Sequence, residues 1–344
     1  MDRLIRAGQI IRSFFSSASP GLIQSFRSDE MAAKISEILK SQEFNVIQVD
    51  FTQMAGYLPA GCKIPSVLVE HDIMFKKYQR VFRVSKSPLV KLQALIDYYK
   101  VREFELGVCR KYDKIIGMSD DDKDLLQQFI PGLDVSVIPN GVDTAYFEPS
   151  GESRDLSKIL FVGGMKNSPN LDAVNYFCEQ MLPLIKKEIP STRFWIMGKE
   201  TDQALQPLLN DGEVKVAGYV DDIRPHLANC GVFVVPLRIA GGTRLKILEA
   251  MAAGCAVVST SVGAEGLEVS DGKNILIADT PKEFVRAVVE VIDNADRQKR
   301  LGANARELVD SKYDWEAIAS VHDDLYRSMA RKEKIKRGKM VCLS

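Results

Sequence analysis

The second half of the chain alternates short apolar runs with longer amphipathic segments. The apolar runs lie at Ile159–Val162, Phe194–Met197, Val214–Ala217, Val232–Val235, Ala256–Val258 and Ile275–Ala278. Helical patterns lie between them, at Asn170–Lys187, Asp202–Asn210, Ile223–Ala228, Arg244–Ala253 and Pro281–Ala295. This alternation predicts a doubly wound α/β domain, in which helices cover a parallel sheet of about six strands.

The first half shows the same alternation more weakly. The predicted strands are Val46–Val49, Ser66–Glu70, Lys114–Met118 and Val135–Ile138, and the predicted helices are Glu30–Ser41, Leu89–Cys109 and Asp121–Phe129. A turn-forming stretch at Pro139–Asp143 separates the two halves. We therefore expect two domains, residues 1–139 and 140–314. A helix at about 315–330 is expected to pack back on the first domain, followed by a basic tail at 331–344.

The segment Val232–Thr260 has the most informative charge pattern. An apolar strand leads into a loop with Gly241–Thr243, and the following helix begins with Arg244 and Lys246. Cations are unfavourable in a first helical turn, by a few tenths of a kcal/mol each, because the macrodipole is positive there. Free amides and two cations at the carboxyl end of a strand predict a phosphate or diphosphate site. In the alternative interpretation, Lys246 pairs with Glu249 and Arg244 projects into water.

Three further strands of the second half end in glycine. The glycines are the pair Gly163-Gly164, then Gly198 and Gly218. Glycine at a strand end lets a ligand approach the backbone closely. The alternative is that these glycines serve only tight packing of strand against helix.

Composition narrows the class of protein. The chain has 344 residues, and its 46 basic side chains balance 46 acidic ones, which argues against a dedicated nucleic-acid binder. The 6 cysteines show no CxxC spacing, so we expect reduced thiols and a cytoplasmic protein. No apolar stretch approaches the roughly 20 residues that a membrane helix needs.

Both termini carry local positive charge. Residues 3–28 contain several arginines and serines and no acidic residue. Such a segment is typical of an amphipathic helix on a membrane surface, here through Ile10, Ile11, Phe14 and Phe15, or alternatively of an organelle transit peptide. At the other end, 331–339 forms a second basic patch or a solvated tail.

Few residues could bind a metal ion or act in nucleophilic catalysis. Asp120–Asp122 is interpreted as the acidic start of a helix, so no metal site is expected. His71 directly follows a predicted strand and should lie at its carboxyl end, whereas His226 and His322 lie in predicted helices and are interpreted as structural. No Ser/His/Asp or Cys/His constellation points to covalent catalysis.

Several motifs, in order, resemble those of a known family. They are VLVEHDIMF (67–75), KIIGMSDDDKDLL (114–126), IPNGVD (138–143), FVGGMKNSPN (161–170), VAGYVDDIRPHLANC (216–230) and PLRIAGGTRLKILEAMAAG (236–254). Together they resemble the retaining glycosyltransferases of family 4. That family has the GT-B architecture, two Rossmann-like domains facing a cleft. The resemblance covers most of the chain from about Phe44 onward.

The resemblance implies roles for particular residues. The implied catalytic residues are His71, Arg244, Lys246 and Glu249. The implied substrate-binding residues are Gly163, Gly164, Lys166, Gly218, Tyr219, Val220, Gly241, Gly242, Thr243 and Leu245. Enzymes of this architecture stabilise the leaving diphosphate with cations and helix-end amides, so neither a metal nor another cofactor is expected.

The sequence departs from the family pattern in three ways. Gly241 stands where the family has the first of two glutamates eight positions apart, Glu249 being the second. Gly164 and Pro169 stand where the first donor loop commonly has Arg and Lys, and Lys166 is a stand-in. Finally, the first domain of this architecture should open with further βα units, so about 70–90 residues are expected to be missing and that domain to be incomplete.

The expected function is transfer of a hexose, with retention, from a UDP- or GDP-sugar to a glycan or lipid-linked acceptor. The resemblance places such a reaction in envelope or exopolysaccharide synthesis, in the cytoplasm, with peripheral contact to the inner face of the plasma membrane. One alternative is a truncated, catalytically silent remnant that still binds nucleotide. Another is a nucleotide-sugar epimerase of the same fold, for which the additional acid and base residues are not found.

Overall fold

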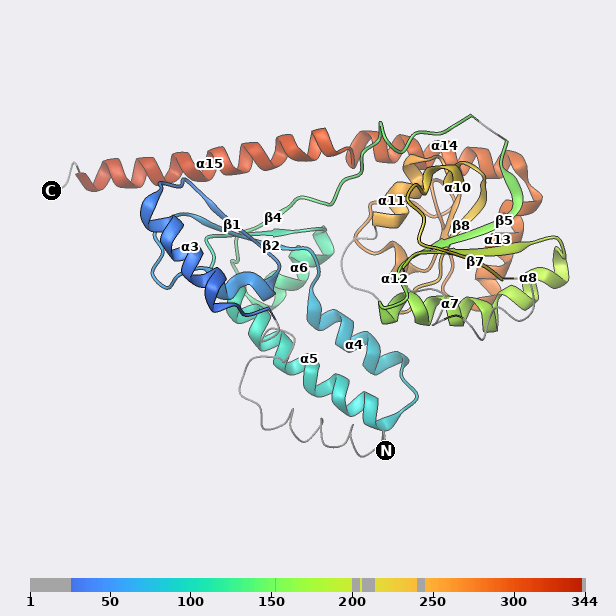
Figure 1. The fold of residues 1–344 in the computed structure, drawn as a ribbon, viewed down its shortest axis with the longest axis horizontal. Coiled ribbons are helices and arrows are strands. Elements are labelled where there is room, and N and C mark those ends of the chain that lie inside the picture. The colour runs from blue at the N-terminus through green and yellow to red at the C-terminus, as the bar shows by residue number, and fades with distance from the viewer. Residues whose placement is uncertain (1–25, 152, 200–204, 206–213, 240–244, 342–344) are drawn as a thin grey trace. The chain divides into compact units, whose positions relative to one another are not determined.

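The computed structural model describes residues 26–151, 153–199, 205, 214–239 and 245–341 (Figure 1). It divides into two compact units. Unit 1 comprises residues up to Pro139 and those from Ala319 onward, and unit 2 comprises Asn140–Ile318. The chain passes out of unit 1 within the predicted turn stretch and returns along a long helix, α15 (Trp315–Val341).

Unit 2 is built on a six-stranded parallel sheet. Its strands are β5 (Asp155–Val162), β6 (Arg193–Met197), β7 (Val214–Gly218), β8 (Cys230–Val235), β9 (Val257–Ser259) and β10 (Leu276–Ile277). Their order is β10-β9-β8-β5-β6-β7. β5 and β8 are therefore direct neighbours, and the strand order reverses between them. In doubly wound sheets this reversal is the topological switch point, where ligands bind at the carboxyl ends of the strands.

Helices pack around this sheet, as Figure 1 shows for α7 and α13. They are α7 (Ser168–Gln180), α8 (Leu182–Glu188), α10 (Arg224–Ala228), α11 (Leu245–Ala252), α12 (Ser261–Ala264), α13 (Pro281–Asp293) and α14 (Ala295–Lys312). α13 packs on β5, β8 and β9, and its start is closed by a capping box between Thr280 and Glu283. The central strand β8 is buried along its whole length, as expected for a strand covered on both faces.

Two helical predictions for unit 2 need correction. The single helix expected at Asn170–Lys187 is two helices, α7 and α8, because the chain breaks at Met181 before Pro183, which cannot donate a helical hydrogen bond. The pattern at Pro281–Ala295 ends at Asp293, and α14, which was not predicted, begins at Ala295 behind the cap residue Asn294. The helix expected at Asp202–Asn210 lies outside the described residues apart from Leu205.

Unit 1 contains a four-stranded parallel sheet in the order β1-β2-β3-β4. Its strands are β1 (Ile47–Asp50), β2 (Ser66–Glu70), β3 (Lys114–Gly117) and β4 (Val135–Val137). Its helices are α3 (Asp29–Ser41), the 3-10 helix η1 (Thr52–Tyr57), α4 (Met74–Val84), α5 (Pro88–Cys109), α6 (Asp120–Phe129) and the later part of α15. The basic tail expected from residue 331 is instead a continuation of α15 as far as Val341.

The sequence did not predict α4, which packs against α5.

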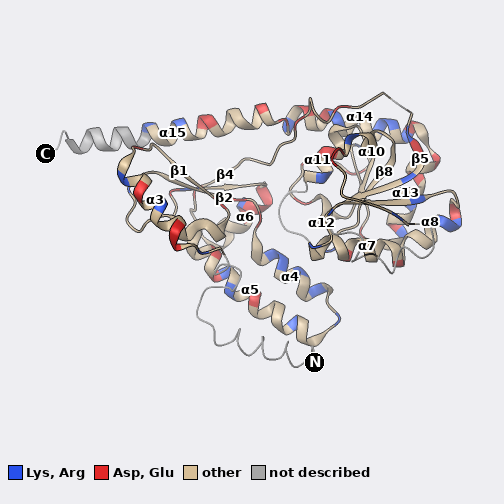
Figure 2. Ribbon diagram, viewed as in Figure 1, with Lys and Arg blue, Asp and Glu red and all other residues tan. Residues whose placement is uncertain are grey.

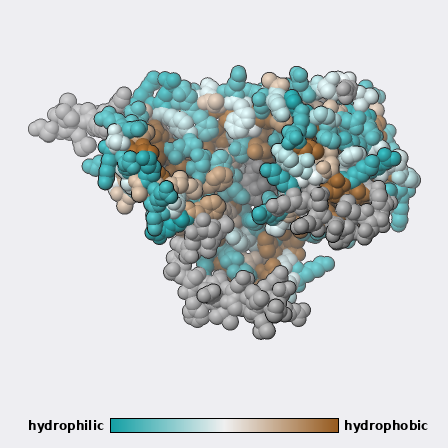
Figure 3. All heavy atoms as spheres, viewed as in Figure 1, coloured by the Kyte–Doolittle hydropathy of each residue, from teal (hydrophilic) through white to brown (hydrophobic). Residues whose placement is uncertain are grey.

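Within the described ranges, every helix is either too short or too polar to serve as a membrane span (residue hydropathy is shown in Figure 3).

Candidate functional site

The predicted donor-binding residues of unit 2 gather around the topological switch point. Gly163 and Gly164 directly follow β5, and Lys246 lies in the first turn of α11, the helix that comes after β8. Since β5 and β8 are adjacent and parallel, the segments that leave their carboxyl ends emerge side by side. Residues 82 positions apart in sequence, Gly164 and Lys246, are thereby brought to one edge of one sheet.

Lys246 and the first glycine loop are joined through Asn170. The Lys246 ammonium donates to Asn170 Oδ1 at 2.9 Å, and Asn170 Nδ2 donates to the Gly164 carbonyl at 3.0 Å. Lys246 Nζ also lies 4.5 Å from the centroid of the Phe161 ring. A Cβ atom at Gly163 would lie only 2.9 Å from Lys246 Nζ, so the cation and the glycine backbone are in contact. The arrangement places a positive charge directly against the half-buried backbone of the loop.

The glycine after β6 is required by close backbone packing. Gly198 has a φ of 149°, and a Cβ atom there would lie 2.2 Å from the Gly163 carbonyl oxygen. Its amide donates to the Gly218 carbonyl at 2.8 Å, and Gly218 itself has a φ of 71°. Positive φ values favour glycine at both positions. The strand-end glycines therefore pack against one another, which differs from the packing of strand against helix in the alternative explanation, and Gly163 also contacts Lys246.

Glu249 is half-buried, one turn into α11. Burial raises the pKa of its carboxyl group, and the positive charge of Lys246 partly offsets that rise. The charge of Lys246 thus affects Glu249, while the hydrogen bond described above joins the Lys246 ammonium to Asn170. A half-buried carboxylate at the start of a helix remains available to accept hydrogen bonds from a polyhydroxyl ligand.

The remaining predicted binding residues of unit 2 differ in exposure. Tyr219 is 62% exposed just beyond β7, with the Lys199 ammonium 5.1 Å from its ring centroid, while Val220 is half-buried. Lys166 is exposed in the loop after β5, and Leu245 is exposed at the start of α11. Gly241, Gly242, Thr243 and Arg244 lie outside the described residues.

His71 belongs to unit 1 and follows β2 directly. Its Nε2 lies 3.0 Å from Asp50 Oδ1 at the end of the neighbouring strand β1, and its ring centroid is 4.5 Å from that of Phe51. Phe51 is exposed and has a φ of 67°, a backbone conformation that is unfavourable for a bulky residue and is typical of functional sites. The carboxyl ends of β1 and β2 thus present a histidine, a carboxylate and an aromatic ring together.

The other histidines and the acidic cluster have structural partners. His322 Nδ1 lies 3.0 Å from the Tyr326 hydroxyl, and His226 lies near the ring of Trp195. In α6, Ser119 caps the first turn, and the buried Asp122 pairs with Lys76 at 3.1 Å. Among the described residues, no group of three or more His, Cys, Asp or Glu side chains is arranged to hold a metal ion.

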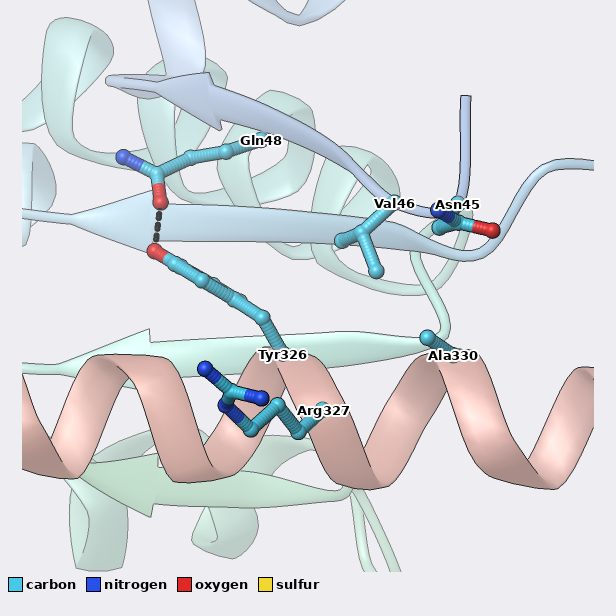
Figure 4. A pocket seen from close by; sticks show the side chains of 6 residues that line it. All are labelled: Asn45, Val46, Gln48, Tyr326, Arg327 and Ala330. Carbon is cyan, nitrogen blue, oxygen red and sulfur yellow. Dashed lines mark hydrogen bonds between the residues drawn. The ribbon is translucent and has the colours of Figure 1, made fainter. Parts of the chain in front are cut away.

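Unit 1 has a cavity of about 370 Å³ beside its first strand (Figure 4). It is lined by Asn45, Val46, Gln48, Tyr326, Arg327 and Ala330. The Tyr326 hydroxyl points from α15 and donates to the Gln48 side-chain oxygen (Figure 4). None of the predicted site residues lines this cavity, so it carries no part of the donor site.

Sequence reasoning did not identify three residues of these arrangements. Asn170 lies within the motif FVGGMKNSPN, but its bond to Lys246 spans 76 positions and has no local pattern. Asp50, opposite His71, ends a strand of another βα unit, and Lys199 contacts Tyr219 from the loop after β6. A polar residue at the carboxyl end of a parallel strand is the one general indication that applied to Asp50.

Comparisons with known proteins agree with this arrangement. A family model described as "Glycosyl transferases group 1" matches residues 157–294, and one described as "Glycosyltransferase Family 4" matches residues 6–146. Among curated relatives, the phosphatidyl-myo-inositol mannosyltransferase of Mycolicibacterium smegmatis is 28% identical over 240 residues, which are 65% of this chain and 60% of the relative.

Two solved structures share the fold. Sucrose-phosphate synthase from Thermosynechococcus elongatus superposes with a TM-score of 0.74 at 19% identity, covering 91% of this chain and 82% of that one. HepE of Anabaena, solved in complex with UDP, gives a TM-score of 0.65 at 16% identity, covering 86% of this chain and 82% of that one. At these identities the similarity shows a common fold.

Proposed function

We propose that this chain transfers a hexose from a nucleoside-diphosphate sugar to a hydroxyl group with retention of configuration. The chain belongs to the family 4 glycosyltransferases of the GT-B fold, as its motifs predicted. The donor is a UDP- or GDP-sugar, and the acceptor is a glycan or a lipid-linked glycan. The observation that carries the proposal is the position of Lys246. A cation at the start of a helix, against glycine backbone at a topological switch point, is suited to a diphosphate.

The reaction makes a specific demand on this site. The bond between C1 of the sugar and the diphosphate oxygen breaks, and negative charge accumulates on the departing diphosphate. The acceptor oxygen bonds to C1, and its hydroxyl proton passes to the departing diphosphate. Lys246 and the N-terminal amides of α11 stabilise that charge because they are fixed in place before the reaction. Arg244 is assigned the same task from its position in the motif.

Other residues are assigned to binding. Glu249 accepts hydrogen bonds from the ribose hydroxyls, and the segment Gly218–Val220 receives the nucleobase. Gly163 and Gly164 allow the diphosphate to approach the backbone, with Lys166 as a further cation. His71 is assigned to the transferred sugar or the departing phosphate. The support for His71 is its half-buried place at the end of β2, beside Asp50.

No metal or other cofactor has a role in this proposal. The same proposal places the reaction in envelope or exopolysaccharide synthesis, in the cytoplasm and at the inner face of the plasma membrane. The mannosyltransferase relative and the fold shared with a UDP-bound structure support a nucleotide-sugar donor.

A donor panel tests the function. The full chain is incubated with UDP- and GDP-hexoses, with and without simple glycan acceptors and with a chelator present, and products are followed by nuclear magnetic resonance. We expect a glycoside whose anomeric configuration equals that of the donor. Inverted product would contradict retention, and dependence on a divalent metal would contradict the assignment of Lys246 and Arg244.

Two outcomes identify the rival functions. A change of the sugar in the absence of any acceptor would identify an epimerase. Saturable nucleotide binding without turnover on any donor would identify a binding protein. The variant Lys187→Ala, which removes an exposed lysine from α8, is the matched control for Lys246→Ala in each assay.

A further inference from the structure

Helices α4 and α5 form a hairpin in unit 1, joined by residues 85–87 (Figure 1). The two helices pack against each other, and Lys91 Nζ of α5 lies 5.6 Å from the Phe82 ring centroid of α4. Side chains on both sides of the connection are therefore close in space. We call the exposed residues around it the hairpin tip; they are Phe82, Arg83, Lys86, Leu89 and Leu92.

The hairpin is strongly basic in a chain without net charge. Between Ile73 and Ile96 there are six basic residues and no acidic one. Figure 2 shows that the charged residues of α4 are all basic. Lys76 is neutralised by the buried Asp122, whereas Lys77, Arg83 and Lys86 form no ion pair within the part of the chain that the structure describes. The local excess of positive charge therefore faces solvent near the tip.

The same region exposes large apolar side chains. Phe82 is 37% exposed, Leu89 46% and Leu92 44%. Along α5 the pattern continues with Leu95 and Tyr99, which lie on the same helical face as Leu89 and Leu92. Apolar side chains here are grouped, unlike single exposed leucines elsewhere on a surface.

We propose that the hairpin tip docks on an anionic lipid surface, with Phe82, Leu89 and Leu92 entering the interface and Arg83 and Lys86 contacting lipid phosphates. Charge complementarity identifies this partner, because basic residues near a negatively charged leaflet each add to binding. A nucleic acid or an acidic glycan would match the charge but would leave the three apolar side chains in water. A neutral apolar partner would gain nothing from the six basic residues.

The docking site rests on the membrane location in the proposed function and names the surface that makes the contact. Its test is independent of transferase activity, because lipid binding is measured without donor or acceptor. The hairpin tip is separate from the basic segment at residues 3–28, which lies almost wholly outside the described residues. Binding of the full chain to vesicles would therefore not show which of the two segments makes the contact. Substitutions in the hairpin tip are needed to test the proposal.

The experiment is co-sedimentation of the full chain with vesicles of phosphatidylcholine alone and of phosphatidylcholine mixed with phosphatidylglycerol. We expect binding to the mixed vesicles only. Arg83→Gln with Lys86→Gln should lower the partition coefficient about 25-fold, roughly fivefold for each cation near the surface. Phe82→Ser with Leu89→Ser should lower it by about tenfold or more, because two apolar side chains no longer leave water.

A control pair has the same chemistry elsewhere on the surface. Leu184 and Lys187 are exposed on α8 of unit 2, so Leu184→Ser with Lys187→Gln should leave the partition coefficient unchanged. Circular dichroism verifies that each variant is folded. If the apolar variant Phe82→Ser with Leu89→Ser does not fold, the charge variant Arg83→Gln with Lys86→Gln still provides the test.

The proposal is overturned if the chain binds neither kind of vesicle or binds both equally. It is also overturned if the tip variants bind as tightly as the parent chain. A change in oligomeric state without a change in vesicle binding would show instead that the tip is a contact between copies of the chain.

Discussion

The cores of the two units differ in polarity. In unit 2 the central strands bury almost only apolar side chains, among them Phe161 and Phe194. In unit 1 the central strand β2 ends in Glu70, which is 1% exposed, and α5 adds Glu105, which is 0% exposed. The core of unit 2 is therefore largely apolar, with Lys158 of β5 as a buried exception, whereas the unit that carries His71 buries two carboxyl groups in its core.

The buried carboxyl groups of unit 1 hold together the segment around His71. Glu105 accepts hydrogen bonds from the amides of Met74 at 3.0 Å and Phe75 at 3.3 Å, at the start of α4. Glu70, the neighbour of His71, accepts hydrogen bonds from Thr52 and, at 3.6 Å, from Cys109. Burial raises the pKa of Glu70 to about 7 and raises that of Glu105 well above its usual range.

The largest expected effect comes from Gly198→Ala in unit 2. The added Cβ would lie 2.2 Å from the Gly163 carbonyl oxygen, and the backbone φ of 149° is unfavourable for alanine. We expect unit 2 to lose about 3 kcal/mol or more of unfolding free energy. Urea unfolding followed by tryptophan fluorescence measures this directly, since both tryptophans, Trp195 and Trp315, belong to unit 2.

Gly164→Ala is the matched control for that substitution. A Cβ atom there would meet only the Lys199 carbonyl, at 3.7 Å, which is an ordinary contact. The control should change the unfolding free energy by less than about 0.5 kcal/mol. Equal effects of the two substitutions would show that the close approach of the strand-end glycines is not what stabilises the edge of this sheet.

The second prediction is a pH dependence of stability that is larger in unit 1 than in unit 2. A carboxyl group whose pKa is raised in the folded state stabilises that state while it is protonated. Its contribution is therefore present below the unfolded-state pKa and is lost as pH rises through about 7 for Glu70. We expect unit 1 to lose up to about 1.4 kcal/mol per pH unit for each proton released, while unit 2 changes little.

Hydrogen exchange of β2 and β3, corrected for intrinsic rates, measures this between about pH 5 and about pH 8. Glu70→Gln replaces the carboxyl with a neutral group of the same shape and should reduce the slope. A steeper pH dependence in β5 and β8 than in β2 would reverse the comparison between the units.

The third and smallest effect concerns Lys246→Ala. Loss of a hydrogen bond to a charged ligand should weaken nucleoside-diphosphate binding by about 1–3 kcal/mol, as measured by calorimetry. Stability should change by less than about 1 kcal/mol, because the lost bond to Asn170 is offset by removal of a cation from a helix N-terminus. A strong loss of stability with unchanged nucleotide affinity would make Lys246 a structural residue.

The sequence predicted every strand of the two described sheets but missed at least one helix in each unit. Buried parallel strands are continuous apolar runs, so β8 and β5 were located from local composition. α4 was missed because its sequence, MFKKYQRVFRV, mixes cations with aromatic and β-branched residues and has no capping side chain. α14 was missed because most of its residues are polar and only one narrow face is buried.

The site could be predicted only in part, because some of its contacts join residues that are far apart in the sequence. The motif around Lys246 indicated a cation at a helix start, and the structure places Lys246 there. The partner Asn170 and the clash that requires Gly198 depend on which strands are adjacent, which one sequence does not specify. The buried pair Glu70 and Glu105 was not predicted either, because a single carboxylate in an apolar strand has no local indication of its partner.

The central claim, that unit 2 binds the nucleotide of the donor, is tested most directly by hydrogen exchange of the full chain with and without UDP or GDP, in the presence of a chelator. The account predicts that at least one nucleotide slows exchange at residues 161–165 and 245–249, and leaves β2 and β3 unchanged. Protection confined to unit 1, no protection by either nucleotide, or protection only when a divalent metal is added would contradict it.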